Sequence, residues 1–152
     1  MRPYRTLITN LILIAQFLYI LIVYPRLPTI IPNHFDANGI PQKHAPRAIL
    51  WLLFLISLAV TTLLQTIAKH PNTFNLPSQL ADPDRSRQTA IAVDLLAWIR
   101  LEIAVLFASI FWSIANGALH RQHNTWLTPA IAILILATAA LHIYRMHHPP
   151  TA

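Results

Sequence analysis

The amino-acid sequence alternates long apolar stretches with shorter polar segments. Residues 6–24 and 49–68 are two stretches without a charged side chain. A helix needs about 20 apolar residues to cross the roughly 30 Å of hydrocarbon in a bilayer. Both stretches have this length, so both are predicted to be membrane-spanning helices. Residues 127–146 follow Trp126 and are predicted as another span, because tryptophan favours the membrane interface.

The remaining apolar stretch, residues 89–119, is longer and less pure. Its first half contains three charged side chains, Asp94, Arg100 and Glu102. Asp82-Pro83 supplies a helix N-cap and a proline suited to the first helical position. We therefore expect one long helix that begins before the bilayer and crosses it over residues 95–119. Asp94 should then lie at the level of the headgroups, and Arg100 should extend toward them.

The composition indicates the same surroundings. Hydrophobic residues make up 55% of the chain and charged residues 11%, whereas a soluble domain carries about a quarter charged residues. The connections between the predicted helices are short, which favours antiparallel neighbours. We predict a single transmembrane domain over residues 1–152. Its fold class is all-α: an integral membrane four-helix antiparallel bundle with a structured proline-rich loop between the first two helices.

The net charge of +6 does not indicate nucleic acid binding, because the 11 Lys and Arg residues are scattered along the chain. Those that flank the predicted spans are more frequent on the side of the two termini. The positive-inside rule then predicts cytoplasmic termini and an outward-facing first loop. The chain has no cysteine, and its two glycines are Gly39 and Gly117. Thiolate metal sites, cysteine nucleophiles and glycine-rich phosphate loops are therefore excluded.

The first loop, residues 25–47, contains five of the twelve prolines. Proline fixes φ and biases the preceding residue toward extended geometry, so the loop is predicted to be stiff. The sequence Asp-Ala-Asn-Gly at residues 36–39 predicts a turn. Asp and Asn side chains bond to nearby backbone, and glycine tolerates positive φ. The best binding candidates in this loop are His34, Phe35, Asp36 and His44. The alternative is a lid that packs onto the end of the bundle through Ile30, Ile31 and Phe35.

The loop also carries a motif, Leu27-Pro28-x-x-Ile31-Pro32-x-His34-Phe35-x-x-x-Gly39-x-Pro41, directly between two spans. With this motif the chain resembles the membrane family called domain of unknown function 1648, over roughly residues 6–119. That domain forms the N-terminal half of SdpI-type immunity proteins, which protect a bacterium against a secreted toxin. The resemblance implies a multi-pass protein of the bacterial cytoplasmic (inner) membrane. It marks Pro32, His34, Phe35, Gly39 and Pro41.

The chain departs from the family pattern in two places of the loop and in one larger region. Gln42 follows Pro41 where many members have an acidic residue, and Arg47 stands only loosely in the place of a lysine. The C-terminal half of SdpI-type proteins, with its Gly-x-Arg-Thr-like run, has no counterpart in the sequence.

The third predicted helix has a polar face. At 100° per residue, Arg100 points almost opposite to this face. The face consists of Trp98, Glu102, Ser109, Ser113 and Asn116. A carboxylate that faces lipid is costly, so the face should point into the bundle or a water-filled cavity. Two interpretations stay open for Glu102: it bonds to Asn10, Gln16 or Gln65 of another helix, or it handles protons or ions.

The remaining polar residues suggest cofactor sites only weakly. Ser57, Thr61 and Gln65 share a face of the second helix. His142 lies well inside the fourth span, and a haem would need it to pair with His70. Candidate metal ligands are His34, Asp36 and His44 in the first loop, and His120 and His123 in the third. Their spacing is not that of a metal site, so we expect no metal and no cofactor.

Two functional hypotheses follow. The first is a non-enzymatic membrane protein whose outer Pro-x-His-Phe loop recognises a peptide, a toxin or a partner protein. The second is a small membrane subunit or homo-oligomeric transporter-like bundle that handles protons or ions at Glu102. Its further intramembrane polar candidates are Gln65, Ser109, Asn116 and His142.

Overall fold

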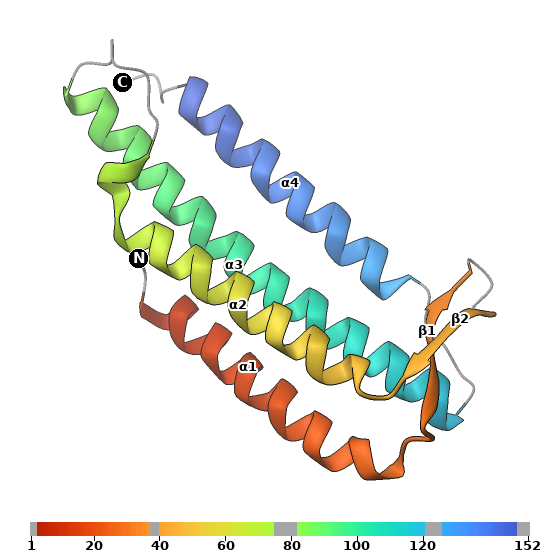
Figure 1. The fold of residues 1–152 in the computed structure, drawn as a ribbon. Helices are drawn as coiled ribbons and strands as arrows, with labels where there is room; N and C mark the ends of the chain where they lie inside the picture. The colour runs from red at the N-terminus through yellow and green to blue at the C-terminus, as the bar shows by residue number, and fades with distance from the viewer. Residues whose placement is uncertain (1–2, 37–39, 75–81, 121–125, 149–152) are drawn as a thin grey trace.

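Four long helices contain most of the residues that the computed structural model describes, which are 3–36, 40–74, 82–120 and 126–148. The helices are α1 (Pro3–Val23), α2 (Ile49–Lys69), α3 (Asp82–His120) and α4 (Leu127–His147). Two 3₁₀ turns, η1 (Tyr24–Arg26) and η2 (Pro71–Thr73), follow α1 and α2. Two strands, β1 (Ile30–Phe35) and β2 (Pro41–Pro46), lie between α1 and α2 (Figure 1).

The prediction of a mostly helical chain with four helices is confirmed. α3 begins at Asp82 and continues for 39 residues, in accordance with the Asp82-Pro83 start signal. Three segments are long and apolar enough to cross a bilayer, namely Tyr4–Arg26, Ile49–Lys69 and Leu127–His147. These segments mark a membrane protein. α3 is not among them, so the fourth span stays a prediction.

α3 lies at the centre of the helices. α1, α2 and α4 each pack against it, and α1 also contacts α2. α4 has α3 as its main neighbour and stands apart from α1 and α2 in Figure 1. Because helices cover α3 from several sides, more than one of its faces is buried.

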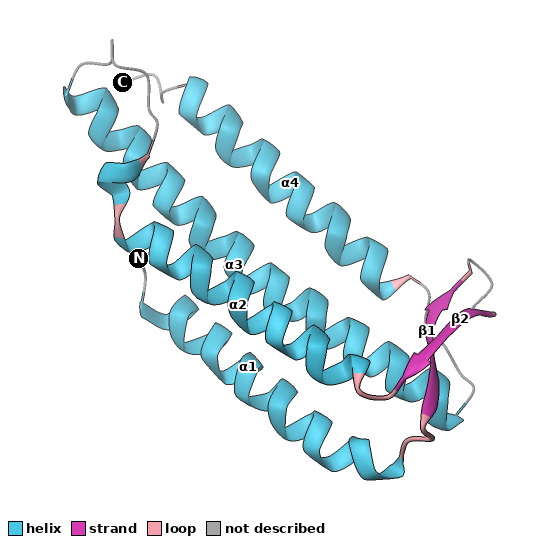
Figure 2. Ribbon diagram, viewed as in Figure 1, coloured by secondary structure: helices cyan, strands magenta, loops and turns pink. Residues whose placement is uncertain are grey.

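The segment between α1 and α2 is a β-hairpin, so the all-α prediction was wrong there (Figure 2). β1 and β2 are antiparallel, and their register pairs Ile30 with Pro46 at one end and Phe35 with Pro41 at the other. The extended backbone that proline favours is also the backbone of a strand. The stiffness predicted from the prolines therefore takes the form of a paired hairpin rather than a loop.

The predicted turn at residues 36–39 lies largely outside the described residues, because 37–39 are not among them. The residues on either side of this gap, Asp36 and Ile40, are described and are hydrogen-bonded to each other. The Asp36 amide donates to the Ile40 carbonyl at 3.0 Å, and the Ile40 amide donates to Asp36 Oδ1 at 2.8 Å. Asp36 therefore bonds nearby backbone, as an Asx residue in a turn does.

The apolar core lies where the hairpin meets α1, α2 and α3. Its buried members are Ile20, Val23, Leu27, Ile31, Leu50, Phe111, Ile114 and Ala115. Elsewhere, large apolar side chains stay exposed along α1, α2 and α4, among them Leu7, Leu55 and Leu136. Such extensive exposed apolar surface is typical of contact with lipid.

Candidate functional site

The hairpin is docked on α3 by apolar side chains of β1. Ile31 and Pro32 are buried, and Phe35 is half-buried. The Phe35 ring lies against Gly117 of α3, where an added Cβ would stand 2.6 Å from Phe35 Cζ. Only a residue without a side chain leaves room for this ring. The lid interpretation is therefore right for Ile31 and Phe35 and wrong for Ile30, which is 62% exposed.

Arg47 fixes the base of the hairpin. Its Nη1 donates to the carbonyls of Tyr24 and Leu27, at 3.3 and 3.0 Å. Its guanidinium also lies 4.6 Å from the centre of the Tyr24 ring, and its amide donates to the Thr29 carbonyl at 2.9 Å. Arg47 thus ties the entry of the hairpin to its exit, a role that sequence reasoning did not assign to it.

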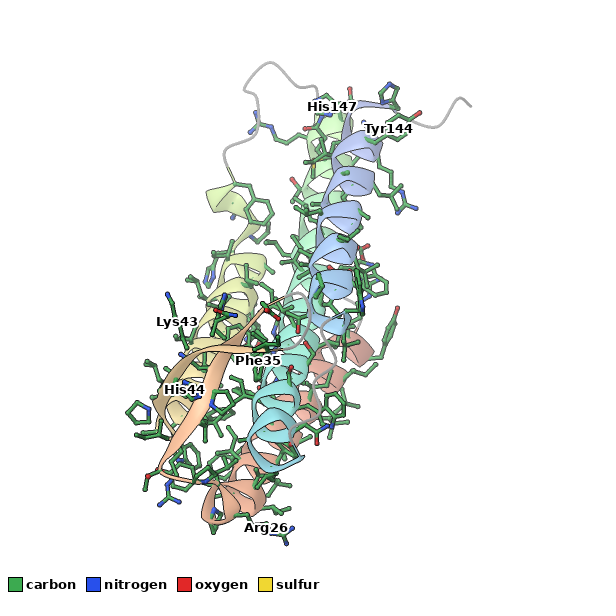
Figure 3. All side chains as sticks on the ribbon, turned by 90° about the vertical axis from the view of Figure 1, so that its right-hand side faces the viewer. Arg26, Phe35, Lys43, His44, Tyr144 and His147 are labelled. Atoms are coloured by element: carbon green, nitrogen blue, oxygen red, sulfur yellow. The ribbon has the colours of Figure 1, made fainter. Side chains whose placement is uncertain are left out.

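Three polar side chains of the hairpin are open to the surroundings. His34, Lys43 and His44 are exposed. The register pairs His34 with Lys43 and shifts on both sides of His34. Such irregularities re-aim side chains. Figure 3 shows Lys43 and His44 on the hairpin, far from Tyr144 and His147 at the other end of the molecule.

The candidate binding residues of the hairpin fall into two groups. Pro32 and Phe35 hold the hairpin on the helices, and Asp36 closes the turn, where its Oδ2 also accepts a bond from Gln42 Nε2 at 3.3 Å. His34 and His44 stay exposed. Gly39 lies outside the described residues, and Pro41 is described only as the start of β2.

A second group of polar residues joins α3 to α4, and we call it the polar seam. Arg87 donates to the carbonyls of Arg145 and Met146, at 3.0 and 3.1 Å. His142 Nε2 lies 3.3 Å from Asp94 Oδ2, and Thr138 donates to Glu102 Oε1 at 2.6 Å. The last contact is that of Ser109 Oγ with Thr128 Oγ1, at 3.4 Å. α4 is thus held to α3 by polar contacts at several levels.

Other polar contacts join α1 to α3. Arg5 donates to Asp94 Oδ1 at 2.6 Å and lies over the Trp98 ring, 4.3 Å from its centre. Arg100 donates to Asn10 Oδ1 at 2.7 Å and is only 2% exposed. α1 therefore covers this face of α3. The expectation that Arg100 extends toward the headgroups stays a prediction.

The expected partners of Glu102 were wrong. Glu102 bonds to Thr138 of α4, whereas Gln16 donates to the Ala104 carbonyl at 2.6 Å and accepts from Ser57 at 3.2 Å. Ser109 and His142 are buried, as expected for a polar face inside the helices. Asn116 and Gln65 are half-buried. The helical period identified the polar face, but it did not tell which helix would cover it.

Among the described residues, the structure does not bring together the cofactor ligands considered from the sequence. Both ring nitrogens of His142 are engaged, by the Thr138 carbonyl at 2.8 Å and by Asp94. His70 instead bonds to the Thr66 carbonyl at 2.9 Å. Within the described ranges no three His, Asp or Glu residues gather as a metal site would need. His123 lies outside those ranges.

The Pro-x-His-Phe motif lies on β1, in the hairpin that joins the apolar helices α1 and α2. Residues 11–59 match the family model described as Domain of unknown function (DUF1648). The match confirms the resemblance seen in the motif, over a shorter range than expected. The DUF1648 segment covers most of α1, the hairpin and the first half of α2. Neither a curated protein nor a solved structure matches the chain.

Proposed function

We propose that the protein is a non-enzymatic, multi-pass membrane protein that recognises a peptide, a toxin or a partner protein through its hairpin. In this proposal α3 is a fourth span, and the helices form an antiparallel four-helix bundle in the bacterial inner membrane. Three apolar segments of spanning length support it. The reversal of chain direction from helix to helix in Figure 1 supports the antiparallel order. Both termini lie in the cytoplasm, and the hairpin faces outward.

The observation that carries the proposal is that the hairpin docks on the helices through apolar side chains and leaves polar side chains exposed. Ile31 and Phe35 are held against the helices, while His34, Lys43 and His44 are exposed beside them. The docking gives the exposed side chains a fixed arrangement, so that little conformational entropy is lost on binding. A loop that served only as a lid would not require this exposed polar face.

The strand sequences favour recognition by side chains over the addition of a partner strand. β1 contains Pro32, and β2 contains Pro41 and Pro46. Proline has no N–H to donate and protects a sheet edge from further pairing. The exposed polar groups of the strands include the ammonium of Lys43 and the imidazoles of His34 and His44. They suit a partner segment with carboxylates or other hydrogen-bond acceptors.

The test is site-specific photo-crosslinking in native membranes. A photo-reactive residue at Ile30, which is 62% exposed on β1, leaves the polar groups in place and should capture one defined species. His34→Ala should lower the yield about tenfold, as expected for loss of a binding hot spot. The matched control carries the photo-reactive residue at Tyr144, which is exposed at the other end of the molecule. Equal crosslinking from both positions, or no effect of His34→Ala with insertion intact, would contradict the proposal.

A further inference from the structure

The polar seam follows a helical repeat. On α3 its members are Arg87, Asp94, Glu102 and Ser109, spaced by seven, eight and seven residues. These steps keep the four residues on one face of a helix. The seam lies apart from the hairpin and mostly outside the DUF1648 segment, so the inference below is independent of the proposed recognition.

Glu102 is the unusual member of the seam. It is 6% exposed, and its Oε1 accepts a bond from Thr138. Its Oε2 is buried and has no hydrogen-bond partner in the described part of the chain. A carboxylate that is ionised, buried and unpaired would be costly, because its charge is removed from water without compensation.

The nearby cations are engaged elsewhere. Arg100 donates to Asn10 on the α1 side of α3, and Arg5 is paired with Asp94. α2 contributes no acidic residue and a single cation, Lys69, in its last turn. On α4, the titratable group one helical turn beyond Thr138 is His142, which bonds to the Thr138 carbonyl and to Asp94. No arginine or lysine of the described residues is bonded to Glu102.

We propose that Glu102 is a proton-binding site within the polar seam, where its carboxyl group holds an exchangeable proton. The carboxyl is buried between α3 and α4, with Oε1 bonded to Thr138 and Oε2 without a hydrogen-bond partner among the described residues. On release, the O–H bond of the carboxyl breaks, the proton passes to water and Glu102 becomes a carboxylate. On uptake, the carboxylate takes a proton back from water.

The competing explanation is that the seam only fastens α4 to α3. Interhelical hydrogen bonds stabilise helix pairs in membranes modestly, and they need no titrating group. The two explanations differ in one observable. A proton-binding site contains a carboxyl group that is protonated at one pH and ionised at another.

Infrared spectroscopy of the full chain in lipid vesicles measures this directly. We expect the carbonyl band of a protonated carboxyl to disappear as the pH is raised from about 6 to about 10, a range in which ordinary exposed carboxyl groups are already ionised. Glu102→Gln should abolish this band, whereas Ser109→Ala, a matched change in the same seam, should keep it. A band that survives Glu102→Gln, or its absence from the unmodified protein over this range, overturns the proposal.

If Glu102→Gln does not fold, Thr138→Val keeps the carboxyl and removes its donor. The band should then persist to a higher pH, and an unchanged titration overturns the assignment to Glu102.

Discussion

The helices are held together by different kinds of contact at the two ends of the molecule, apolar at one and polar at the other. At the hairpin end, where α1 stops and α2 begins, buried Ile, Leu, Val and Phe side chains pack around Phe111. At the terminal end, where α1 begins and α4 stops, charged and polar groups meet. Arg5, His142 and Glu102 are buried, and the half-buried Asp94 contacts the first two. The same central helix, α3, takes part in both.

Burial has a different energetic consequence for the side chains at each end. Lipid tails are as apolar as leucine, so apolar packing inside a membrane gains mainly from close fit and not from leaving water. A close fit suits a fixed platform, which is what the hairpin end provides. Polar groups in the same surroundings are costly to leave unpaired and can change their protonation, which is what the terminal end offers.

The largest effect is expected at the apolar end. Phe111→Ala should lower the free energy of unfolding by about 3–5 kcal/mol, because Phe111 is 1% exposed and a cavity would replace its ring. Denaturant unfolding in mild detergent measures this. Leu136→Ala on α4 is the control, since Leu136 is 71% exposed and its loss should stay within about 0.5 kcal/mol. Equal losses of stability in the two variants would contradict a stabilising role for the apolar core around Phe111.

A smaller effect is expected at the polar end. Asp94→Ala should cost about 1–3 kcal/mol, because Arg5 and His142 each lose an acceptor. The loss is less than for a fully buried ion pair, since the Asp94 side chain is 39% exposed and water screens its charge. The same unfolding experiment applies. Asp94→Asn retains the shape of the side chain, so its free energy of unfolding should lie between those of the unmodified protein and Asp94→Ala. An Asp94→Ala variant as stable as the unmodified protein would show that these contacts do not stabilise the terminal end.

The smallest effect concerns a single bond of the seam. Thr138→Val removes the donor to Glu102 and should cost about 0.6 kcal/mol, the average for such bonds in membranes. Thr62→Val on α2 is the matched control, because Thr62 is exposed. The two unfolding curves should separate by this amount. Their coincidence would mean that the bond between Thr138 and Glu102 adds nothing to the seam.

The helices could be predicted because their signals are local. The apolar stretches predict α1, α2 and α4 within a few residues, and Asp82-Pro83 predicts the start of α3. The hairpin could not be predicted in this way. Its docking depends on Phe35 meeting Gly117, which lies far along the chain and carries no motif of its own.

The candidate site shows the same limit. The period of α3 placed Glu102, Ser109 and Asn116 on one face, yet the partners of Glu102 and Arg100 depended on which helix covers each face. The repeat of seven and eight residues through Arg87, Asp94, Glu102 and Ser109 was present in the sequence. Together with Thr138 and His142 four residues apart on α4, it is the signal that could have identified the seam.

The central claim is that the hairpin is a fixed surface and not a free loop. The chain has no cysteine, so spin labels can be attached to cysteines introduced at two chosen sites, Lys43 on the hairpin and Leu119 on α3. Pulsed electron paramagnetic resonance in lipid vesicles should give one narrow distance distribution. Gly117→Val, which places a side chain where the Phe35 ring lies, should broaden it. A broad distribution before any substitution, or a narrow one that Gly117→Val leaves unchanged, would contradict the account.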